Sequence, residues 1–213
     1  ENLAEWIRAV IEDFSTNSEN SLMNLQNDPA WDKPLAGFAN GNDPIWEEYK
    51  RDIGEFYWTP AEIFTLTFPS VPVKPEDLTV ISWILPQTKQ TKLDHRKEKH
   101  LPSERWARSR KYGEEYNVKL RLYLVKTLVD KGYEALAPML SSQWKMEVSE
   151  YYGLASTWSE RHAAYAAGLG TFGLCDGLIT PLGKAMRCGS VVARIPIDPI
   201  PRPYQDPRGA RIP

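Results

Sequence analysis

The sequence predicts an α+β domain in which a central mixed sheet is flanked by helices. Residues 78–85 form an unbroken apolar and β-branched run, which is typical of a strand covered on both faces. Residues 2–14 and 115–130 instead repeat apolar side chains with the helical period. Short β-branched runs at 178–180 and 190–193 supply further strands, so both kinds of element share one core.

The first half of the chain contains three predicted helices. The first covers 2–14, and Asp43-Pro44 then combines an N-cap residue with a first-turn proline, which starts a helix through Tyr49. Thr59-Pro60 repeats this signal and starts the third. Residues 15–42 are rich in Asn, Ser, Asp and Gly, so we expect a long loop there.

The second half begins with the strand at 78–85. Ser103 predicts a helix start after Pro102, and this helix leads into the segment 115–130. Apolar side chains on nearly every side of that segment predict a helix buried in the domain interior. Gly132 then ends it. The remaining elements are a strand at 133–139, a helix at 159–167, the two short strands and a proline-rich tail from 195 that is expected to be extended.

We divide the chain into three segments on these patterns. Residues 1–75 form a helical and loop-rich N-terminal segment that packs on the core. Residues 76–195 form the α+β core itself, and residues 196–213 form a proline-rich linker.

Composition limits the possible functions. The chain has 213 residues, of which 42% are hydrophobic, and this is enough for one sizeable core. Its formal net charge is −2, so we do not expect a nucleic-acid partner. The two cysteines, Cys175 and Cys188, are too few for an iron–sulfur cluster, and the three histidines share no metal-ligand spacing, so we expect no metal site made by the protein alone. No apolar run is long enough to span a bilayer, so we expect a cytoplasmic protein with no membrane partner.

Residues 168–173 match the pattern G-x-G-x-x-G. A dinucleotide fingerprint needs a preceding strand and a carboxylate about 20 residues later, and neither is present. Two interpretations remain open. The glycines could leave bare backbone against which a large, flat ligand lies, or they could form a helix C-cap followed by a tight turn.

Two further features allow both a functional and a structural interpretation. Cations crowd the segment 87–111, which could hold a phosphate or an RNA backbone, or could simply be a solvated face. Tyr116, in the first turns of the 115–130 helix, could donate a proton into a closed cavity or could be a packed core tyrosine.

Three segments together resemble a known family. Residues 159–173 are similar to the E-R-x-x-A-x-x-A-G-L-G-x-x-G signature of epoxyqueuosine reductases and their relatives, the reductive dehalogenases. Residues 177–190 are similar to the stretch that follows this signature, and residues 112–120 are similar to the family's Y-G-R-D-Y-H-x-x-L segment. The matches cover about 78–200 and occur in the family's order.

The resemblance implies a nitroreductase-like α+β domain that binds cobalamin, a corrinoid. It implies that the natural protein continues into a ferredoxin-like domain whose two [4Fe–4S] clusters feed electrons to cobalt, and that the reaction reduces a small-molecule substrate. It also implies that Tyr116 is the catalytic proton donor. The residues implied to bind the cofactor are Tyr112, Asn117, Arg161, His162, Gly168, Leu169, Gly170, Thr171, Phe172, Gly173, Ile179, Thr180 and Arg187.

Departures from the family pattern argue against queuosine chemistry. The family's catalytic Asp falls on Ser141 or Leu154, neither of which is an acid. The histidine after the family's tyrosine is Asn117, and the lysine after the glycine signature is Leu174. The leading expectation is therefore the cobalamin-binding domain of an iron–sulfur-dependent reductase whose substrate is unknown. The alternatives are a corrinoid carrier or chaperone without its own chemistry, a flavin-binding nitroreductase-like domain, and a domain that places tRNA on the basic segment.

Overall fold

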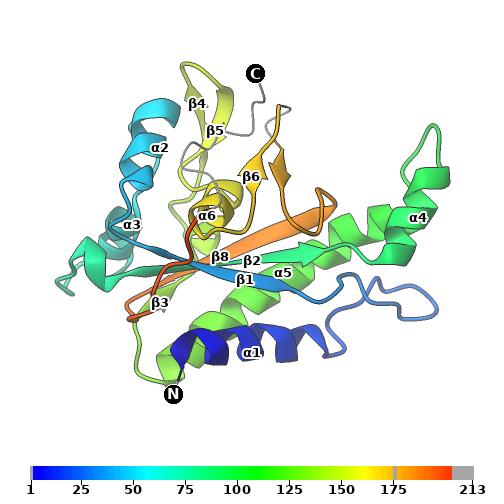
Figure 1. Cartoon of the computed structure of the whole chain (residues 1–213), viewed down its shortest axis with the longest axis horizontal. Coiled ribbons are helices and arrows are strands. Elements are labelled where there is room, and N and C mark those ends of the chain that lie inside the picture. Colours follow the sequence, from blue (N-terminus) through cyan, green and yellow to red (C-terminus); the bar gives the residue numbers. More distant parts are fainter. Residues whose placement is uncertain (1, 175–176, 203–213) are drawn as a thin grey trace.

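The computed structural model describes residues 2–174 and 177–202, and a four-stranded sheet runs through its centre (Figure 1). The strand order is β1 (Leu35–Asn40), β2 (Thr79–Pro86), β8 (Met186–Ala193) and β3 (Ala135–Leu136). Helices cover both faces, which confirms the α+β class. Every pairing in this sheet is antiparallel, so the sheet is not mixed as expected from the sequence.

The strand β2 forms the middle of the sheet, as its apolar run predicts. All eight of its residues are buried. Thr79 pairs with Ala193 of β8 at one end of the strand, and Leu35 of β1 pairs with Ile84 near the other. Successive side chains of a strand point to opposite faces. Val80 and Ile84 therefore join one hydrophobic core, whereas Ile81 and Trp83 join a second core on the other face.

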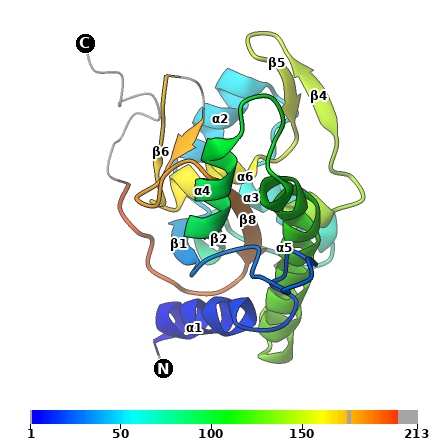
Figure 2. The same cartoon turned by 90° about the vertical axis from the view of Figure 1, so that its right-hand side faces the viewer.

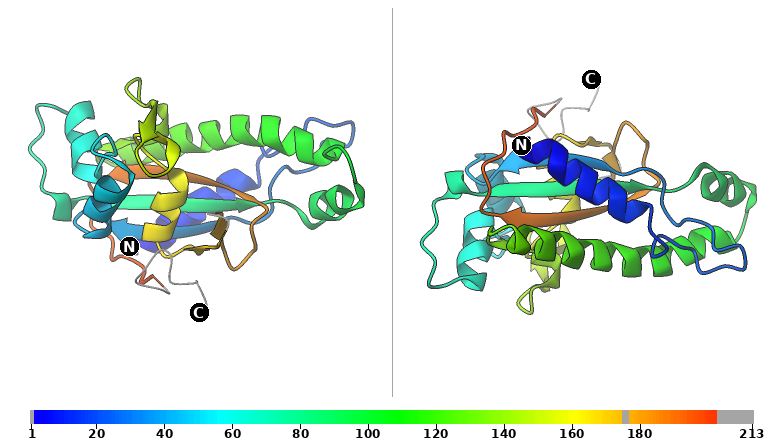
Figure 3. Two further views of the ribbon diagram at one scale, coloured as in Figure 1. Left: turned by 90° about the horizontal axis from the view of Figure 1, so that it is seen from above. Right: turned by 90° about the horizontal axis from the view of Figure 1, so that it is seen from below.

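One face of the sheet is covered by α1 (Leu3–Ser15) and α5 (Glu104–Asp130) (Figure 3). The Asn2 side chain accepts hydrogen bonds from the first turn of α1, and Ser103 caps α5 in the same way. Interior burial of α5 was predicted, and this is wrong for one of its sides. Leu122 and Val129 are 56% and 52% exposed, because only the side that faces the sheet and α1 is covered.

The other face carries α2 (Ile45–Ile53), α3 (Pro60–Thr67) and α6 (Glu160–Ala166). Thr59 and Glu62 form a capping box at the start of α3, which explains the strength of that sequence signal. Trp46 of α2 stacks on Trp158, with 5.6 Å between ring centroids. This stacking joins α2 to the segment just before α6.

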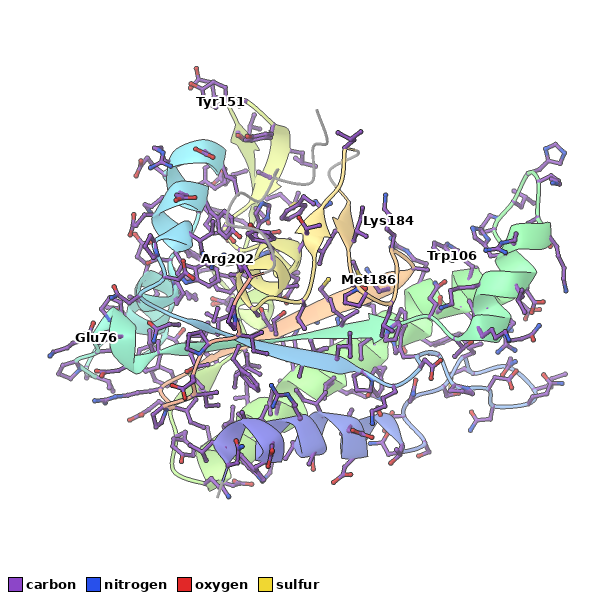
Figure 4. All side chains as sticks on the ribbon, in the orientation of Figure 1. Glu76, Trp106, Tyr151, Lys184, Met186 and Arg202 are labelled. Atoms are coloured by element: carbon purple, nitrogen blue, oxygen red, sulfur yellow. The ribbon has the colours of Figure 1, made fainter. Side chains whose placement is uncertain are left out.

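Two hairpins stand on the same face as α6. One is formed by β4 (Met146–Ser149) and β5 (Gly153–Ser156), and the other by β6 (Thr171–Phe172) and β7 (Leu178–Ile179). Tyr151, at the turn of the β4–β5 hairpin, points away from the body of the protein (Figure 4). Two short 3₁₀ helices, η1 (Pro75–Asp77) and η2 (Pro138–Leu140), complete the connections.

Several elements were not predicted from the sequence, among them β1, α4 (Lys89–Lys97) and the two strands of the β4–β5 hairpin. The strand β1 lies inside the expected loop at 15–42, and its composition of Leu, Ala, Gly, Phe and Asn has few of the β-branched residues that mark strands. The helix α4 has one large apolar side chain, Leu93, so it lacks a helical apolar stripe.

The segment 194–202 has no regular structure and follows the surface, as its prolines predict. Ile195 and Ile197 are buried in the core beneath the sheet. The Ile200 amide donates to the Phe38 carbonyl at 2.8 Å, so the segment runs along the outer edge of β1. None of the helices in the described part of the chain combines the length and hydropathy needed to cross a bilayer.

Candidate functional site

A pocket of about 360 Å³ lies between α2, α6, the β6 strand and the β4–β5 hairpin. Four aromatic side chains line it: Tyr49, Tyr57, Tyr152 and Phe172. Asp52, Ser159, Arg161 and His162 add polar groups. An apolar pocket with a few convergent polar groups is the usual form of a ligand site.

The helix α2 supplies one wall because of the spacing of its side chains. Tyr49 and Ile53 are four residues apart and so lie on the same face of the helix. The Tyr49 hydroxyl donates to the His162 carbonyl at 3.3 Å, which ties this wall to α6. Burial raises the pKa of Tyr49 well above its ordinary value, so its phenol stays protonated.

His162 is held in the pocket by a hydrogen-bond contact and by two aromatic rings. Its Nδ1 lies 2.8 Å from the Ser159 hydroxyl, and its ring packs against Tyr49 and Phe172 with centroids 4.7 and 4.9 Å away. Burial lowers the pKa of His162 to about 3, and the nearby Arg161 charge acts in the same direction. His162 is therefore a neutral imidazole with a fixed orientation, and it lines the pocket.

The β4–β5 hairpin extends the pocket as an apolar wall. Met146 and Leu154 line the pocket, and Val148 pairs with Leu154 across the hairpin. Val148 and Leu154 are 76% and 74% exposed, although both are large apolar side chains. The base of the hairpin is anchored, because the Trp144 indole donates to the Trp158 carbonyl at 3.1 Å. We call Met146, Val148 and Leu154 the hairpin wall; exposed apolar patches of this kind mark interaction sites.

The glycine signature packs against the chain's own atoms. A Cβ at Gly168 would lie 2.9 Å from the Ile200 side chain, and one at Gly170 would lie 2.3 Å from the Ile179 carbonyl oxygen. Gly168 has a φ of +75° and follows the last turn of α6, which is the position of a helix C-cap glycine. At Gly173 the same space holds the Ile179 side chain. These glycines therefore allow close packing of the tail and the β6–β7 hairpin.

Tyr116 and Asn117 lie away from the pocket. Tyr116 is in the core between the sheet, α1 and α5, on the opposite face from α6, and its ring centroid is 5.4 Å from that of Phe14. Asn117 accepts from the Trp83 indole at 3.0 Å and donates to the Cys188 carbonyl at 2.9 Å. The structure thus separates Tyr116 from Arg161, His162 and Phe172, which it brings together.

The other residues implied by the resemblance are scattered. Arg187 forms an ion pair with Glu114 at 2.8 Å, and the Thr180 hydroxyl donates to the Gly183 carbonyl at 2.8 Å. Ile179 is partly exposed on the β6–β7 hairpin. Leu169 is buried against Gly37. The buried hydroxyl of Thr171 has no hydrogen-bond partner in the described part of the chain. The ring of Tyr112 lies beneath the Lys111 ammonium.

A buried ion pair supports the start of α6. Arg121 of α5 contacts the Glu160 carboxylate at 3.1 Å, and the Ser190 hydroxyl donates to the same carboxylate. Burial raises the pKa of Glu160, whereas the Arg121 charge opposes this rise. Arg121 also reaches the Cys188 carbonyl, on the stretch of β8 that β3 does not cover. Glu160 lies between Ser159 and Arg161 in the sequence, so this ion pair fixes the position of two residues that line the pocket.

Sequence reasoning missed most of the pocket wall. Tyr49, Tyr57 and the hairpin wall come from segments that carry no motif, and only the spacing of Tyr49 and Ile53 gives a local signal. Leu154 was considered as the position of the family's catalytic Asp, and it does line the pocket. Of the two cysteines, Cys188 is buried and Cys175 lies outside the described residues. Among the described residues, no three His, Cys, Asp or Glu side chains gather as a metal site would require.

A larger hollow of about 660 Å³ lies beside α2 but is a weaker candidate. It is lined by polar groups that include Asn42, Glu48 and Glu76. Arg202 and Asp43 also border it and form an ion pair with each other. It therefore offers no enclosed apolar surface to a ligand.

Comparisons with known proteins give matches among solved structures. No family model matches the chain, and no curated protein matches it. Its fold is similar to that of solved epoxyqueuosine reductases: a selenomethionine-labelled one (14% identity, TM-score 0.45), one from Bacillus subtilis with its catalytic loop swung out of the active site (15%, 0.45), and one with a tRNA-Tyr stem loop (13%, 0.40). Each alignment covers 96% of this chain and 48% of the other, so the chain spans about half the length of these proteins.

Proposed function

We propose that this chain is the corrinoid-binding domain of an epoxyqueuosine reductase-like enzyme, and that the corrinoid lies in the aromatic pocket and along the hairpin wall. One observation carries the proposal. The pocket that contains Arg161, His162 and Phe172 opens directly onto exposed apolar side chains of the β4–β5 hairpin. A ligand larger than the pocket would cover both.

The size of the pocket decides how such a ligand would bind. Ligand pockets hold roughly 300–1,000 Å³, and this pocket of about 360 Å³ is near the lower limit. A corrin ring with its amide side chains is larger, so only one edge would enter. Methyl groups of the ring would then lie against Val148 and Leu154, and its amide side chains would meet Ser159 and Arg161. The residues present fit a corrinoid in this arrangement.

The residues around the pocket have different tasks in this proposal. When bound, the corrinoid would supply a reducing cobalt centre. His162 offers a neutral imidazole that does not change its charge near neutral pH. Tyr57 has a buried hydroxyl beside the Ser159 backbone, and burial raises its pKa, so this phenol keeps its proton. Tyr57 can therefore donate a hydrogen bond into the pocket, but its raised pKa makes it a weaker acid than a free tyrosine, so it does not take over the proton-donor task that the resemblance assigns to Tyr116.

Corrinoid titration tests the proposal. We expect hydroxocobalamin to bind the purified chain at micromolar concentration, with a change in its visible spectrum. Leu154→Asp places a charge on the wall and should weaken binding at least about tenfold, because an apolar contact is lost and a charge is desolvated. Leu122→Asp, at an exposed leucine on the opposite face, is the matched control and should bind like the unmodified chain. Absence of binding, or equal weakening by both changes, would contradict the proposal.

A corrinoid carrier without its own chemistry is the second candidate. Two observations favour it. Leu154, at one of the two positions expected for the family's catalytic Asp, lines the pocket and cannot donate a proton. Tyr116 lies in the core on the other face of the sheet, away from the pocket. Corrinoid binding without turnover, when an iron–sulfur electron donor is supplied, would support it. A flavin in the same pocket would be recognised by a yellow colour and by flavin fluorescence after unfolding.

The expectation against a nucleic-acid partner needs correction. It rested on the net charge of the whole chain, which does not describe any one surface. Segment 89–111 has nine cationic and three acidic residues, so one end of the molecule can attract a polyanion. One solved neighbour contains a tRNA stem loop, and an RNA hairpin is accordingly included among the ligands to be tested on this segment.

A further inference from the structure

One end of the molecule combines positive charge with exposed leucines. It is formed by α4, the loop after it, the start of α5 and the loop at 22–28, all of which face the viewer in Figure 2. We call residues 22–28 and 89–111 the basic end. It lies apart from the aromatic pocket, which is beside α2 and the β4–β5 hairpin.

Several cations of the basic end are available to a partner. Arg105 pairs with Asp28, Arg108 pairs with Glu104, and Lys97 pairs with Asp94. Others are exposed and form no ion pair within the described part of the chain. These are Lys89, Arg96, Lys99 and Arg110.

Apolar side chains project from the same end. Leu25 is 100% exposed and Leu101 is 75% exposed, and each is on a loop that extends beyond the sheet. Met23 and Leu93, which lie near them in the sequence, are also exposed. A single exposed leucine on a protein surface needs no explanation. Here two projecting loops carry leucines at the end of the molecule that also carries the exposed cations, so this end presents both apolar and positively charged groups.

Both loops are held in place. The Leu22 amide donates to the Asp28 carbonyl at 2.7 Å, which closes the 22–28 loop, and the Arg108 guanidinium donates to the Met23 carbonyl at 2.8 Å. His95 stacks on Trp106, with 4.3 Å between centroids, and so fixes α4 on α5. The leucines are therefore presented by braced loops.

We propose that the basic end binds an anionic lipid surface, with Leu25 and Leu101 entering the headgroup region and the exposed lysines and arginines contacting lipid phosphates. Apolar side chains combined with a basic surface are the general features of peripheral membrane binding. The sequence expectation of no membrane partner rested on the lack of a spanning segment, and a peripheral surface does not need one. The proposal is independent of corrinoid binding.

The leucines favour a lipid surface over RNA. An RNA backbone is held by cations, and its bases stack on aromatic rings, so exposed leucines add nothing to its binding. Trp106, the aromatic ring at this end, is covered on one side by His95. An anionic bilayer uses both the leucines and the cations.

Vesicle sedimentation with the full chain tests the proposal. We expect the chain to bind vesicles of phosphatidylcholine mixed with phosphatidylglycerol at about 0.1–1 mM lipid, and to bind phosphatidylcholine alone at least about tenfold more weakly. Leu25→Ser combined with Leu101→Ser should weaken binding at least about tenfold, as should Lys89→Glu combined with Lys99→Glu. Leu122→Ser and Lys126→Glu, both at exposed positions on α5 away from this end, are the matched controls.

The outcomes separate lipid from RNA. Loss of vesicle binding in the leucine variant, with an unchanged circular dichroism spectrum, supports the proposal. No sedimentation of the unmodified chain, or a leucine variant that binds as well as the unmodified chain, overturns it. Binding of an RNA hairpin that the leucine changes leave intact, without binding to anionic vesicles, also overturns it and assigns the basic end to nucleic acid.

Discussion

Arg121 of α5 and Glu160 of α6 form an ion pair at 3.1 Å although their side chains are only 2% and 12% exposed. The pair passes the edge of β8 where β3 has ended, so it connects a helix on one face of the sheet to a helix on the other. It therefore couples the two cores and fixes the start of α6, on which His162 lies.

Removal of Arg121 should destabilise the fold. In Arg121→Met the Glu160 carboxylate loses its buried counter-charge, and we expect the free energy of unfolding to fall by about 3–5 kcal/mol at pH 7.5, measured by urea denaturation. Burial already raises the pKa of Glu160, and loss of Arg121 raises it further. Since protonation removes the buried charge, the loss of stability should shrink as the pH falls to about 5. Lys126→Met breaks an exposed pair and should change stability by less than about 1 kcal/mol at either pH. A loss for Arg121→Met that does not depend on pH would contradict this account.

His162 should remain neutral through the physiological range. Burial lowers its pKa from the ordinary 6.5 to about 3, so its imidazole resonances should not titrate between pH 5 and 8 in an NMR titration, with His162→Gln used for assignment. A folded pKa below the unfolded value gives stability that is present above about pH 6.5 and is lost as the pH falls towards 3. His162→Gln should therefore show a flatter decline of stability in acid. A titration midpoint near 6.5 would show that the imidazole is open to water.

Gly168 should be less tolerant of alanine than Gly153. Both have positive φ angles, +75° and +68°, so alanine strains the backbone at each by about 1–2 kcal/mol. A Cβ at Gly168 also meets Ile200 and Pro201, whereas one at Gly153 meets nothing within 4 Å. We expect Gly168→Ala to cost roughly 1–3 kcal/mol more than Gly153→Ala in thermal or urea unfolding. Equal costs would mean that the tail does not press on Gly168 in solution.

Tyr116→Phe should leave corrinoid binding unchanged and should not destabilise the chain. The Tyr116 hydroxyl is buried with no hydrogen-bond partner in the described part of the chain, so its removal should raise the free energy of unfolding by up to about 1 kcal/mol. Tyr49→Phe removes a hydroxyl that donates to the His162 carbonyl and should lower stability by about 0.5–1.5 kcal/mol. Hydroxocobalamin binding is measured by visible titration. Weaker binding by Tyr116→Phe would contradict this prediction and would show that Tyr116 contributes to the corrinoid site.

Local sequence patterns predicted the elements that have a regular arrangement of apolar side chains or a clear capping signal. The apolar run of β2, the helical period of α1 and the proline signal at Thr59-Pro60 each report a local environment, and each element is present. The strand β1 was missed because its place in the sheet depends on pairing with β2, a partner about 45 residues away. The helix α4 was missed because it has no apolar stripe.

The candidate site was predicted only in part. Arg161, His162 and Phe172 are close in sequence and share the pocket, whereas Tyr49 joins them from a distant segment and Leu154 from the hairpin that precedes α6. Tyr116 was grouped with them through the family resemblance, but α5 packs on the other face of the sheet, so its side chain enters the opposite core.

The sequence by itself therefore determined the α+β class, the buried central strand and the segment that begins α6, because periodicity and capping residues act within a few positions of the chain. Only the tertiary structure decided which side chains meet. The face of the sheet on which a helix packs separates Tyr116 from His162, and the return of the tail past β1 covers Gly168. These contacts join positions far apart in sequence, and no local pattern records them.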